Sequence, residues 1–127
     1  MIVRDLSELK ASGRFVEKEG QWSSARYLLK DDGVGFTLTQ TRLAAGQELE
    51  MEYKNHIEAN LVIEGEGDLT ELASGRKYAL IPGSMYTLDK HDRHHLRAVT
   101  DMRLVCVFTP ALTGQETHDQ DGSYPLL

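Results

Sequence analysis

The chain has 127 residues, 40% of them hydrophobic and 27% charged, which fits a single globular domain over residues 1–127. A net charge of -6 argues against a nucleic-acid partner, and no apolar run approaches the roughly 20 residues that span a bilayer. The N-terminus has no signal-type apolar region and Cys106 is the only cysteine, so we expect a cytoplasmic protein with no intrachain disulfide and no membrane partner.

The first third of the chain predicts short strands separated by turns. Residues 2–3 indicate a short strand, and Ser7 is a candidate cap for one helical turn. Glycine-containing turns bound a strand over 24–30, and a threonine-rich strand follows over 35–43.

The strongest strand signal covers residues 47–54. Leu49, Met51 and Tyr53 alternate there with three glutamates, which predicts a strand with one buried face.

The rest of the chain continues this pattern. Strands are predicted over 59–64, 68–72, 77–81, 84–88, 94–99 and 102–108, and the glycines at 65 and 67 indicate a hairpin-type connection. Short strands at this spacing predict an all-β fold, an antiparallel sandwich or barrel with at most short helical turns. The polar residues after 110 are typical of a frayed terminus.

Two glycine-marked segments resemble the motifs of the cupin superfamily, which has a jelly-roll-like fold. The spacing from Gly46 through Glu58 to Gly65 is similar to the first cupin motif, and the Pro–Gly turn at 82–83 is similar to the second. Two histidines of the usual metal-ligand set are replaced here by Glu52 and Lys54, so Glu58 alone keeps the usual residue type.

A narrower resemblance extends over the whole chain. The segments that carry it are MIVRDL at the start, WSSARYLLKDDG at 22–33, YKNHIEA at 53–59, LDKHDRHHLRA at 88–98 and CVFTPALTGQETHDQDGSYPL at 106–126. Together they resemble the ectoine synthases, which are cupin hydro-lyases. The resemblance implies the closure of N-gamma-acetyl-L-2,4-diaminobutyrate into ectoine, a compatible solute made under osmotic stress, with loss of water.

The resemblance also implies a homodimer with one Fe(II) per subunit. Its ligands would be Glu58, Tyr86 and His94. Two oxygen donors and one imidazole suit Fe(II), although Mn(II) or Zn(II) would accept similar donors. Such a cation would act as a Lewis acid on a carbonyl oxygen.

The resemblance further implies a substrate site. Its residues would be Trp22, Arg26, Thr41, Tyr53, Cys106, Phe108, Glu116 and His118. Among these, Glu116, His118 and Tyr53 are candidates for proton transfer, and Arg26 for binding a carboxylate. On this basis we expect residues 110–127 to act as an active-site lid and not as a frayed end.

Each of these residues also has a simpler interpretation. Arg26 could pair with one of the many carboxylates, and Cys106 could be an inert buried thiol. On a strand His95 would face away from His94, and His56 would form a hydrogen bond that fixes the turn before Glu58.

The chain departs from many ectoine synthases at a few positions. Glu50 and Glu52 predict a more acidic entrance, and Thr109 stands where asparagine is common. Two alternative functions therefore remain: a cupin hydrolase or cyclase acting on a related N-acetylated diamine, and a cupin that binds a small solute without catalysis.

Overall fold

The computed structural model describes all 127 residues, nearly all of the regular structure being β-strand. The elements are α1 (Leu6–Ala11), β1 (Phe15–Lys18), β2 (Trp22–Leu28), the 3-10 turn η1 (Lys30–Asp32), β3 (Thr37–Leu43), β4 (Glu48–Met51), β5 (Ile57–Glu64), β6 (Gly67–Glu71), β7 (Arg76–Leu80), β8 (Met85–Thr87), β9 (His94–Ala98) and β10 (Met102–Thr109). The single α-helix has six residues, and no helix is long and apolar enough to cross a membrane.

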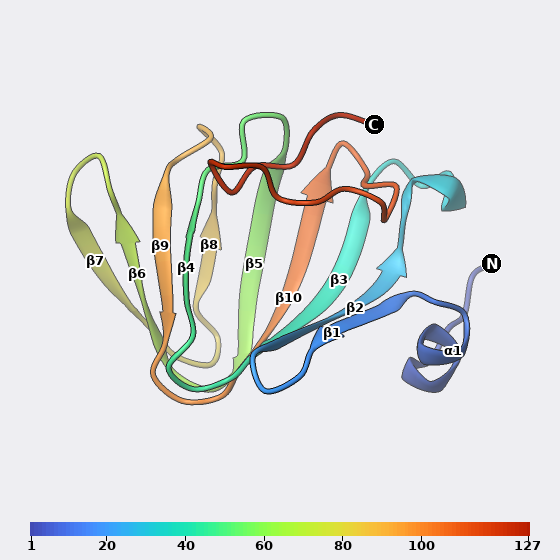
Figure 1. Ribbon diagram of the computed structural model, residues 1–127, viewed down its shortest axis with the longest axis horizontal. Coiled ribbons are helices and arrows are strands. Elements are labelled where there is room, and N and C mark those ends of the chain that lie inside the picture. Colours follow the sequence, from blue (N-terminus) through green and yellow to red (C-terminus); the bar gives the residue numbers. More distant parts are fainter.

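The strands form two antiparallel sheets that face each other (Figure 1). One sheet has six strands in the order β1-β2-β3-β10-β5-β8, and the other has four in the order β4-β9-β6-β7. The predicted all-β antiparallel sandwich is confirmed, because every strand pair in both sheets is antiparallel.

The turn at Gly65 is not the predicted hairpin connection. Strand β5 belongs to the six-stranded sheet and β6 to the four-stranded one, so the turn is a corner at which the chain changes sheet. Gly65 has φ +84, and a side chain there would overlap the carbonyl oxygen of Asp101. Glycine is therefore required by both backbone conformation and close approach.

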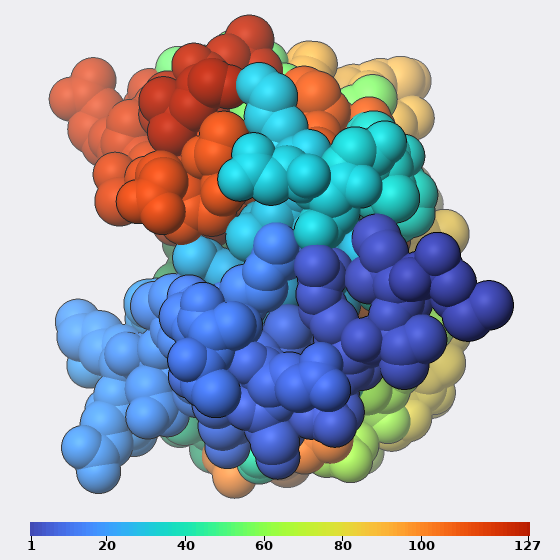
Figure 2. Space-filling view, turned by 90° about the vertical axis from the view of Figure 1, so that its right-hand side faces the viewer, coloured from blue at the N-terminus to red at the C-terminus, as the bar shows by residue number.

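The N-terminal segment differs from its prediction in two ways. Residues 2–3 form no strand, and β1 forms at 15–18 instead, where it pairs with β2. Helix α1 is capped by Asp5 and not by Ser7, because the Asp5 side chain accepts a hydrogen bond from the backbone N–H of Glu8 at 3.0 Å. Figure 2 shows how this segment covers the lower part of one face of the molecule.

The hydrophobic core lies between the two sheets. Val62 and Leu104 contribute to it from the six-stranded sheet, and Leu69 and Leu96 from the four-stranded sheet, all at most 7% exposed. Residues after β10 cross the upper ends of the strands in the view of Figure 1 and pass from the β3 side to β4. The interior of the sandwich is therefore covered on that side by the tail.

A buried carboxylate joins the N-terminal segment to the rest of the fold. Asp32 accepts hydrogen bonds from the guanidinium groups of Arg4 and Arg14 and from the N–H of Leu29. Its side chain is 7% exposed. The hydrogen bond from Arg4 is the largest of the effects that hold the pKa of Asp32 far below its usual range.

We predict that Asp32→Ala lowers the free energy of unfolding by about 3 kcal/mol, because it leaves two arginines without their buried partner. The measurement is chemical denaturation at pH 7. Since the folded pKa is lowered, the contribution is complete above the ordinary carboxyl pKa and is lost as the pH falls through the folded value. Asp31→Ala, at an exposed neighbouring carboxylate, is the matched control and should change little.

Candidate active site

A cavity of about 370 Å³ lies between the sheets and beneath the tail. The predicted site residues that line it are Trp22, Arg26, Thr41, Tyr53, Glu58, Tyr86, Cys106, Phe108, Glu116 and His118. His94 is 1% exposed and is not part of the lining. The structure thus brings residues from six separate segments of the sequence to one place.

The floor of the cavity is a row of side chains that crosses five strands. Strand pairing places Arg26 opposite Thr39, Thr39 opposite Cys106, Cys106 opposite Asn60, and Asn60 opposite Tyr86. Side chains of directly paired residues lie on the same face of a sheet. A guanidinium and a phenol therefore stand at opposite ends of one continuous row.

Glu58 is buried and Tyr86 is half-buried, and both side chains line the cavity. Burial raises the pKa of Glu58 to about 7, and the neighbouring Asn60 amide acts in the opposite direction. Burial, followed by the charge of Glu58, raises the pKa of Tyr86 well above its usual value. No arginine or lysine forms an ion pair with Glu58. A bound cation would favour the ionised form of both groups.

The His94 ring lies near that of Tyr86 and has a nitrogen without a hydrogen-bond partner. Its Nδ1 donates to the carbonyl oxygen of Asp92 at 2.9 Å, while its buried Nε2 has no hydrogen-bond partner. The ring centroids of Tyr86 and His94 are 6.4 Å apart. No three side chains of histidine, cysteine, aspartate or glutamate gather in the chain, so a three-ligand site here needs the tyrosine as well. The donors present fit a hard or borderline divalent cation.

The other histidines near this set have different surroundings. His95 lies on the opposite face of β9 from His94, as predicted, with its Nε2 3.2 Å from a carboxylate oxygen of Glu48. His56 does not show the predicted hydrogen bond at Nδ1, which has no partner. Its ring packs edge-on against Phe108, at 6.3 Å between centroids, so it supports the Glu58 turn by packing.

Tyr53 and His118 form a hydrogen-bonded pair on the other side of the cavity. The Tyr53 hydroxyl lies 2.9 Å from Nε2 of His118. Burial lowers the pKa of His118, so its imidazole is neutral at pH 7, and burial also keeps the pKa of Tyr53 well above its usual value. A neutral imidazole next to a phenol can accept and return a proton.

Glu116 is held as an ionised carboxylate. It accepts hydrogen bonds from the N–H and the hydroxyl of Thr113 and from the N–H of Gly114, at 2.7 to 3.0 Å. Although burial raises the pKa of Glu116, these bonds outweigh it and the net shift is downward. The carboxylate therefore fixes the turn at 113–114 and releases no proton near neutral pH.

Arg26 has no carboxylate partner. One guanidinium nitrogen donates to the carbonyl oxygen of Gly114 at 3.0 Å. Because a guanidinium carries five N–H donors, most of its capacity remains available in the cavity.

Cys106 is a buried thiol. Burial raises its pKa to about 12, and its Sγ lies 3.6 Å from the hydroxyl of Thr41. The thiol is protonated at neutral pH and is unsuited to act as a nucleophile.

Comparison with known proteins identifies the family of the chain. A family model described as ectoine synthase matches residues 1–127. The chain belongs to the ectoine synthase family.

Curated relatives of the chain carry the name L-ectoine synthase. The protein from Sphingopyxis alaskensis is 53% identical over 125 residues, covering 98% of this chain and 90% of the relative. The protein from Saccharophagus degradans is 50% identical over 126 residues, covering 99% of this chain and 95% of the relative. As a member of the ectoine synthase family, the chain is an enzyme, by name a hydro-lyase.

Solved structures confirm the predicted cupin fold. The crystal structure of ectoine synthase from P. lautus matches with a TM-score of 0.86 at 49% identity, covering all of this chain and 91% of the other. An RmlC-like cupin from Shewanella frigidimarina matches with a TM-score of 0.64 at 18% identity, over 76% of this chain and 83% of the other. At that identity the likeness shows the fold alone.

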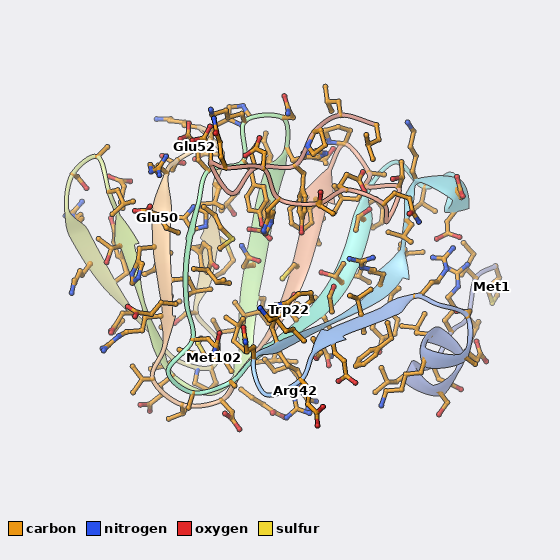
Figure 3. All side chains as sticks on the ribbon, in the orientation of Figure 1. Met1, Trp22, Arg42, Glu50, Glu52 and Met102 are labelled. Atoms are coloured by element: carbon orange, nitrogen blue, oxygen red, sulfur yellow. The ribbon has the colours of Figure 1, made fainter.

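The acidic residues that depart from many ectoine synthases are paired in this chain. Arg93 donates to Glu50 at 3.1 Å and to Glu52 at 3.4 Å, and it lies 3.8 Å from Asp121. Lys54 donates to Asp121 at 2.7 Å. Glu52 lies next to the tail in Figure 3. The predicted acidic entrance is therefore largely neutralised.

Thr109, the other departure, ends β10 on the surface and does not line the cavity.

Thr39, Asn60 and Tyr124 are among the cavity residues that the sequence analysis did not identify. Thr39 and Asn60 share faces with Thr41 and Glu58, so alternation along β3 and β5 could have identified them. Tyr124 lies in a tail without regular structure, and no pattern in the sequence indicates it.

Proposed function

We propose that the chain is an iron-dependent L-ectoine synthase that converts N-gamma-acetyl-L-2,4-diaminobutyrate to ectoine and water, in compatible-solute biosynthesis under osmotic stress. The observation that carries the proposal is the cavity row. It has the Arg26 guanidinium, with most of its N–H donors free, at one end and the Tyr86 phenol at the other. The Glu58 carboxyl lines the same cavity, and the His94 imidazole lies behind the lining with its ring centroid 6.4 Å from that of Tyr86. An amino acid with an acetamide at the end of its side chain has groups that complement both ends, a carboxylate for the guanidinium and a carbonyl oxygen for the proposed metal end.

Glu58, Tyr86 and His94 would hold the iron. Bound there, Fe(II) would supply Lewis acidity toward a carbonyl oxygen without a change of redox state. In support, the buried Nε2 of His94 has no protein partner and the Glu58 carboxyl has no cationic one.

The other residues of the cavity would orient the substrate. Arg26 would bind the substrate carboxylate through two parallel hydrogen bonds. The ionised Glu116 would attract the α-ammonium group. Trp22 and Phe108 would pack on the methylene chain and exclude water, which favours a reaction that releases water.

Proton transfer would depend on the Tyr53–His118 pair. Neutral His118 would take a proton from the α-ammonium group, after which the nitrogen bonds to the acetamide carbon. The carbonyl oxygen then leaves as water with the two remaining protons of that nitrogen, which gives a cyclic amidine. His118 returns its proton to the amidine, which becomes an amidinium, and the neutral imidazole is restored. Because the Glu116 carboxylate is held by three hydrogen bonds, we assign proton transfer to His118 and Tyr53.

We predict that Glu58→Ala loses both bound iron and ectoine formation, because the site loses its carboxylate ligand. The measurements are metal content and product chromatography after anaerobic incubation with Fe(II) and the substrate. Glu64→Ala, an exposed glutamate on the same strand, is the matched control and should retain both. Retention of iron by Glu58→Ala would remove Glu58 from the ligand set. A wild-type enzyme that makes no ectoine would contradict the function, and a hydrolysed product would favour a hydrolase of related N-acetylated diamines.

We also propose that residues 110–127 form a lid. A chain that ends after Thr117 keeps Leu112 and Glu116 but lacks His118. We expect it to bind iron normally and to lose ectoine formation by about 100-fold or more, since it lacks the proton-transfer group. A chain that ends after Pro125 lacks only two exposed leucines and is the control. Full turnover by the shorter chain would refute the lid.

We further propose a homodimer formed through the edge of the six-stranded sheet. Strand β8 is the last strand of that sheet, and Met85 on it is 63% exposed beside Leu61 at 42%. Light scattering should give twice the chain mass of 14.3 kDa. Met85→Glu should give monomers, whereas Val99→Glu, at another exposed apolar site, should not. A monomeric wild-type protein would contradict this proposal.

A cytoplasmic location and the absence of a nucleic-acid partner stay predictions from the sequence.

A further inference from the structure

The tail reverses direction immediately after His118. A carboxylate oxygen of Asp119 accepts from the N–H groups of Asp121 at 2.8 Å and Ser123 at 3.1 Å. The N–H of Asp119 donates to the carbonyl oxygen of Ser123 at 2.8 Å. This turn brings Tyr124 back toward the histidine that precedes it.

The turn is attached to the segment that follows β4. The N–H of Lys54 donates to the hydroxyl of Ser123 at 2.8 Å, and the Asn55 amide donates to the carbonyl oxygen of Tyr124 at 2.9 Å. A Cβ at Gly122 would lie 2.8 Å from the carbonyl oxygen of Glu50, so only glycine allows this close approach. Tyr124 is thereby fixed relative to Tyr53.

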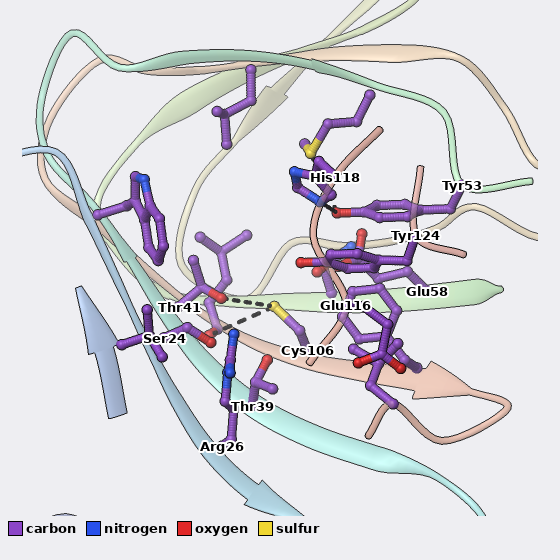
Figure 4. A pocket seen from close by; sticks show the side chains of 18 of the residues that line it. Ser24, Arg26, Thr39, Thr41, Tyr53, Glu58, Cys106, Glu116, His118 and Tyr124 are labelled. Atoms are coloured by element: carbon purple, nitrogen blue, oxygen red, sulfur yellow. Dashed lines mark hydrogen bonds between the residues drawn. The ribbon is translucent and has the colours of Figure 1, made fainter. Parts of the chain in front are cut away.

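The attachment places the Tyr124 ring against both members of the hydrogen-bonded pair. Its centroid is 4.3 Å from that of His118, at 31° between planes, and 5.2 Å from that of Tyr53, at 32°. Figure 4 shows the two tyrosine rings one above the other beside His118. Phe108 and His56 pack edge-on against the same ring.

We propose that Tyr124 is a positioning residue whose ring holds the His118 imidazole at the Tyr53 hydroxyl and shields it from water. Offset aromatic stacking at this separation restricts the imidazole to one orientation. The hydrogen bond between Nε2 of His118 and Tyr53 is then already formed before substrate enters. The kinetic test of Tyr124 rests on the proposed function, whereas the titration of His118 does not.

The shielding has a measurable consequence for His118. Burial lowers the pKa of His118, and Asp119 acts in the opposite direction; Tyr53 and Tyr124 are the other titratable groups that face it. When water replaces the Tyr124 ring, the pKa of His118 rises toward its ordinary value. If neutral His118 accepts the proton, the acidic limb of the kcat profile moves to higher pH.

The test compares Tyr124→Leu, Tyr124→Phe and Tyr78→Leu in the full-length protein. Tyr78 is 42% exposed on β7 and controls for the loss of a tyrosine elsewhere. The His118 imidazole is titrated by NMR, with His118→Gln identifying its signal, and kcat and KM are measured against pH with Fe(II).

For Tyr124→Leu we expect an upward shift in the pKa of His118 and a loss of about 10- to 100-fold in kcat, with a much smaller change in KM. Tyr124→Phe and Tyr78→Leu should keep wild-type titration and kcat within about twofold, since both retain the ring on His118. Should the leucine variant not fold, Asn55→Ala releases the backbone of Tyr124 and is expected to shift both readouts in the same direction, by less.

Two results would overturn the proposal. An unchanged His118 titration and kcat in Tyr124→Leu would show that the ring does not position His118. A loss of kcat in Tyr124→Phe equal to that in Tyr124→Leu would assign the effect to the hydroxyl. A wild-type protein that makes no ectoine would sink the proposed function and would leave the titration of His118 as an independent test of Tyr124.

Discussion

The burial of polar groups without protein partners is the constraint on which this structure depends. Glu58, the Tyr86 phenol and Nε2 of His94 lie within a sandwich whose other interior side chains are mostly apolar. A buried charge without a counter-ion is costly, and a buried nitrogen without a hydrogen bond is costly too. The fold tolerates them because two sheets and a core of leucine, valine and methionine surround the cavity. A cation that neutralises Glu58 and accepts the lone pair of His94 Nε2 would remove these costs, which favours its binding.

The second requirement is a cover for the cavity, and the tail provides it without a helix or strand. Its contacts are individually small: the turn held by Glu116, the guanidinium of Arg26 on Gly114, and the hydroxyl of Ser123 on the backbone of Lys54. The first shapes the tail itself, and the other two join it to β2 and to the loop after β4, both of which also carry cavity residues. The position of the cover and the shape of the cavity are therefore set together.

Much of the site could be predicted from the sequence because its members lie in distinctive segments. Alternation along 47–54 gave the buried face of Leu49 and Met51, and the family motifs gave ten of the cavity residues. Strand β1 was missed because FVEK is short, half charged and exposed over its second half, and its only strand partner is β2. The corner at Gly65 looked like a hairpin because local turn chemistry carries no information about which sheet the next strand joins. The pairing of Arg93 with Glu50 and Glu52 depends on tertiary proximity, which no spacing along the chain encodes.

The attachment of the tail has a consequence for ionic strength. Its ion pairs, from Asp121 to Lys54 and to Arg93, lie on the surface with side chains 31–50% exposed. The screening length in solution falls from about 8 Å at physiological ionic strength to about 3 Å at 1 M, so such pairs weaken as salt rises. The Ser123 and Asn55 hydrogen bonds and the close approach at Gly122 involve neutral groups and are not screened in this way. The cover over the cavity therefore stays in place in concentrated electrolyte.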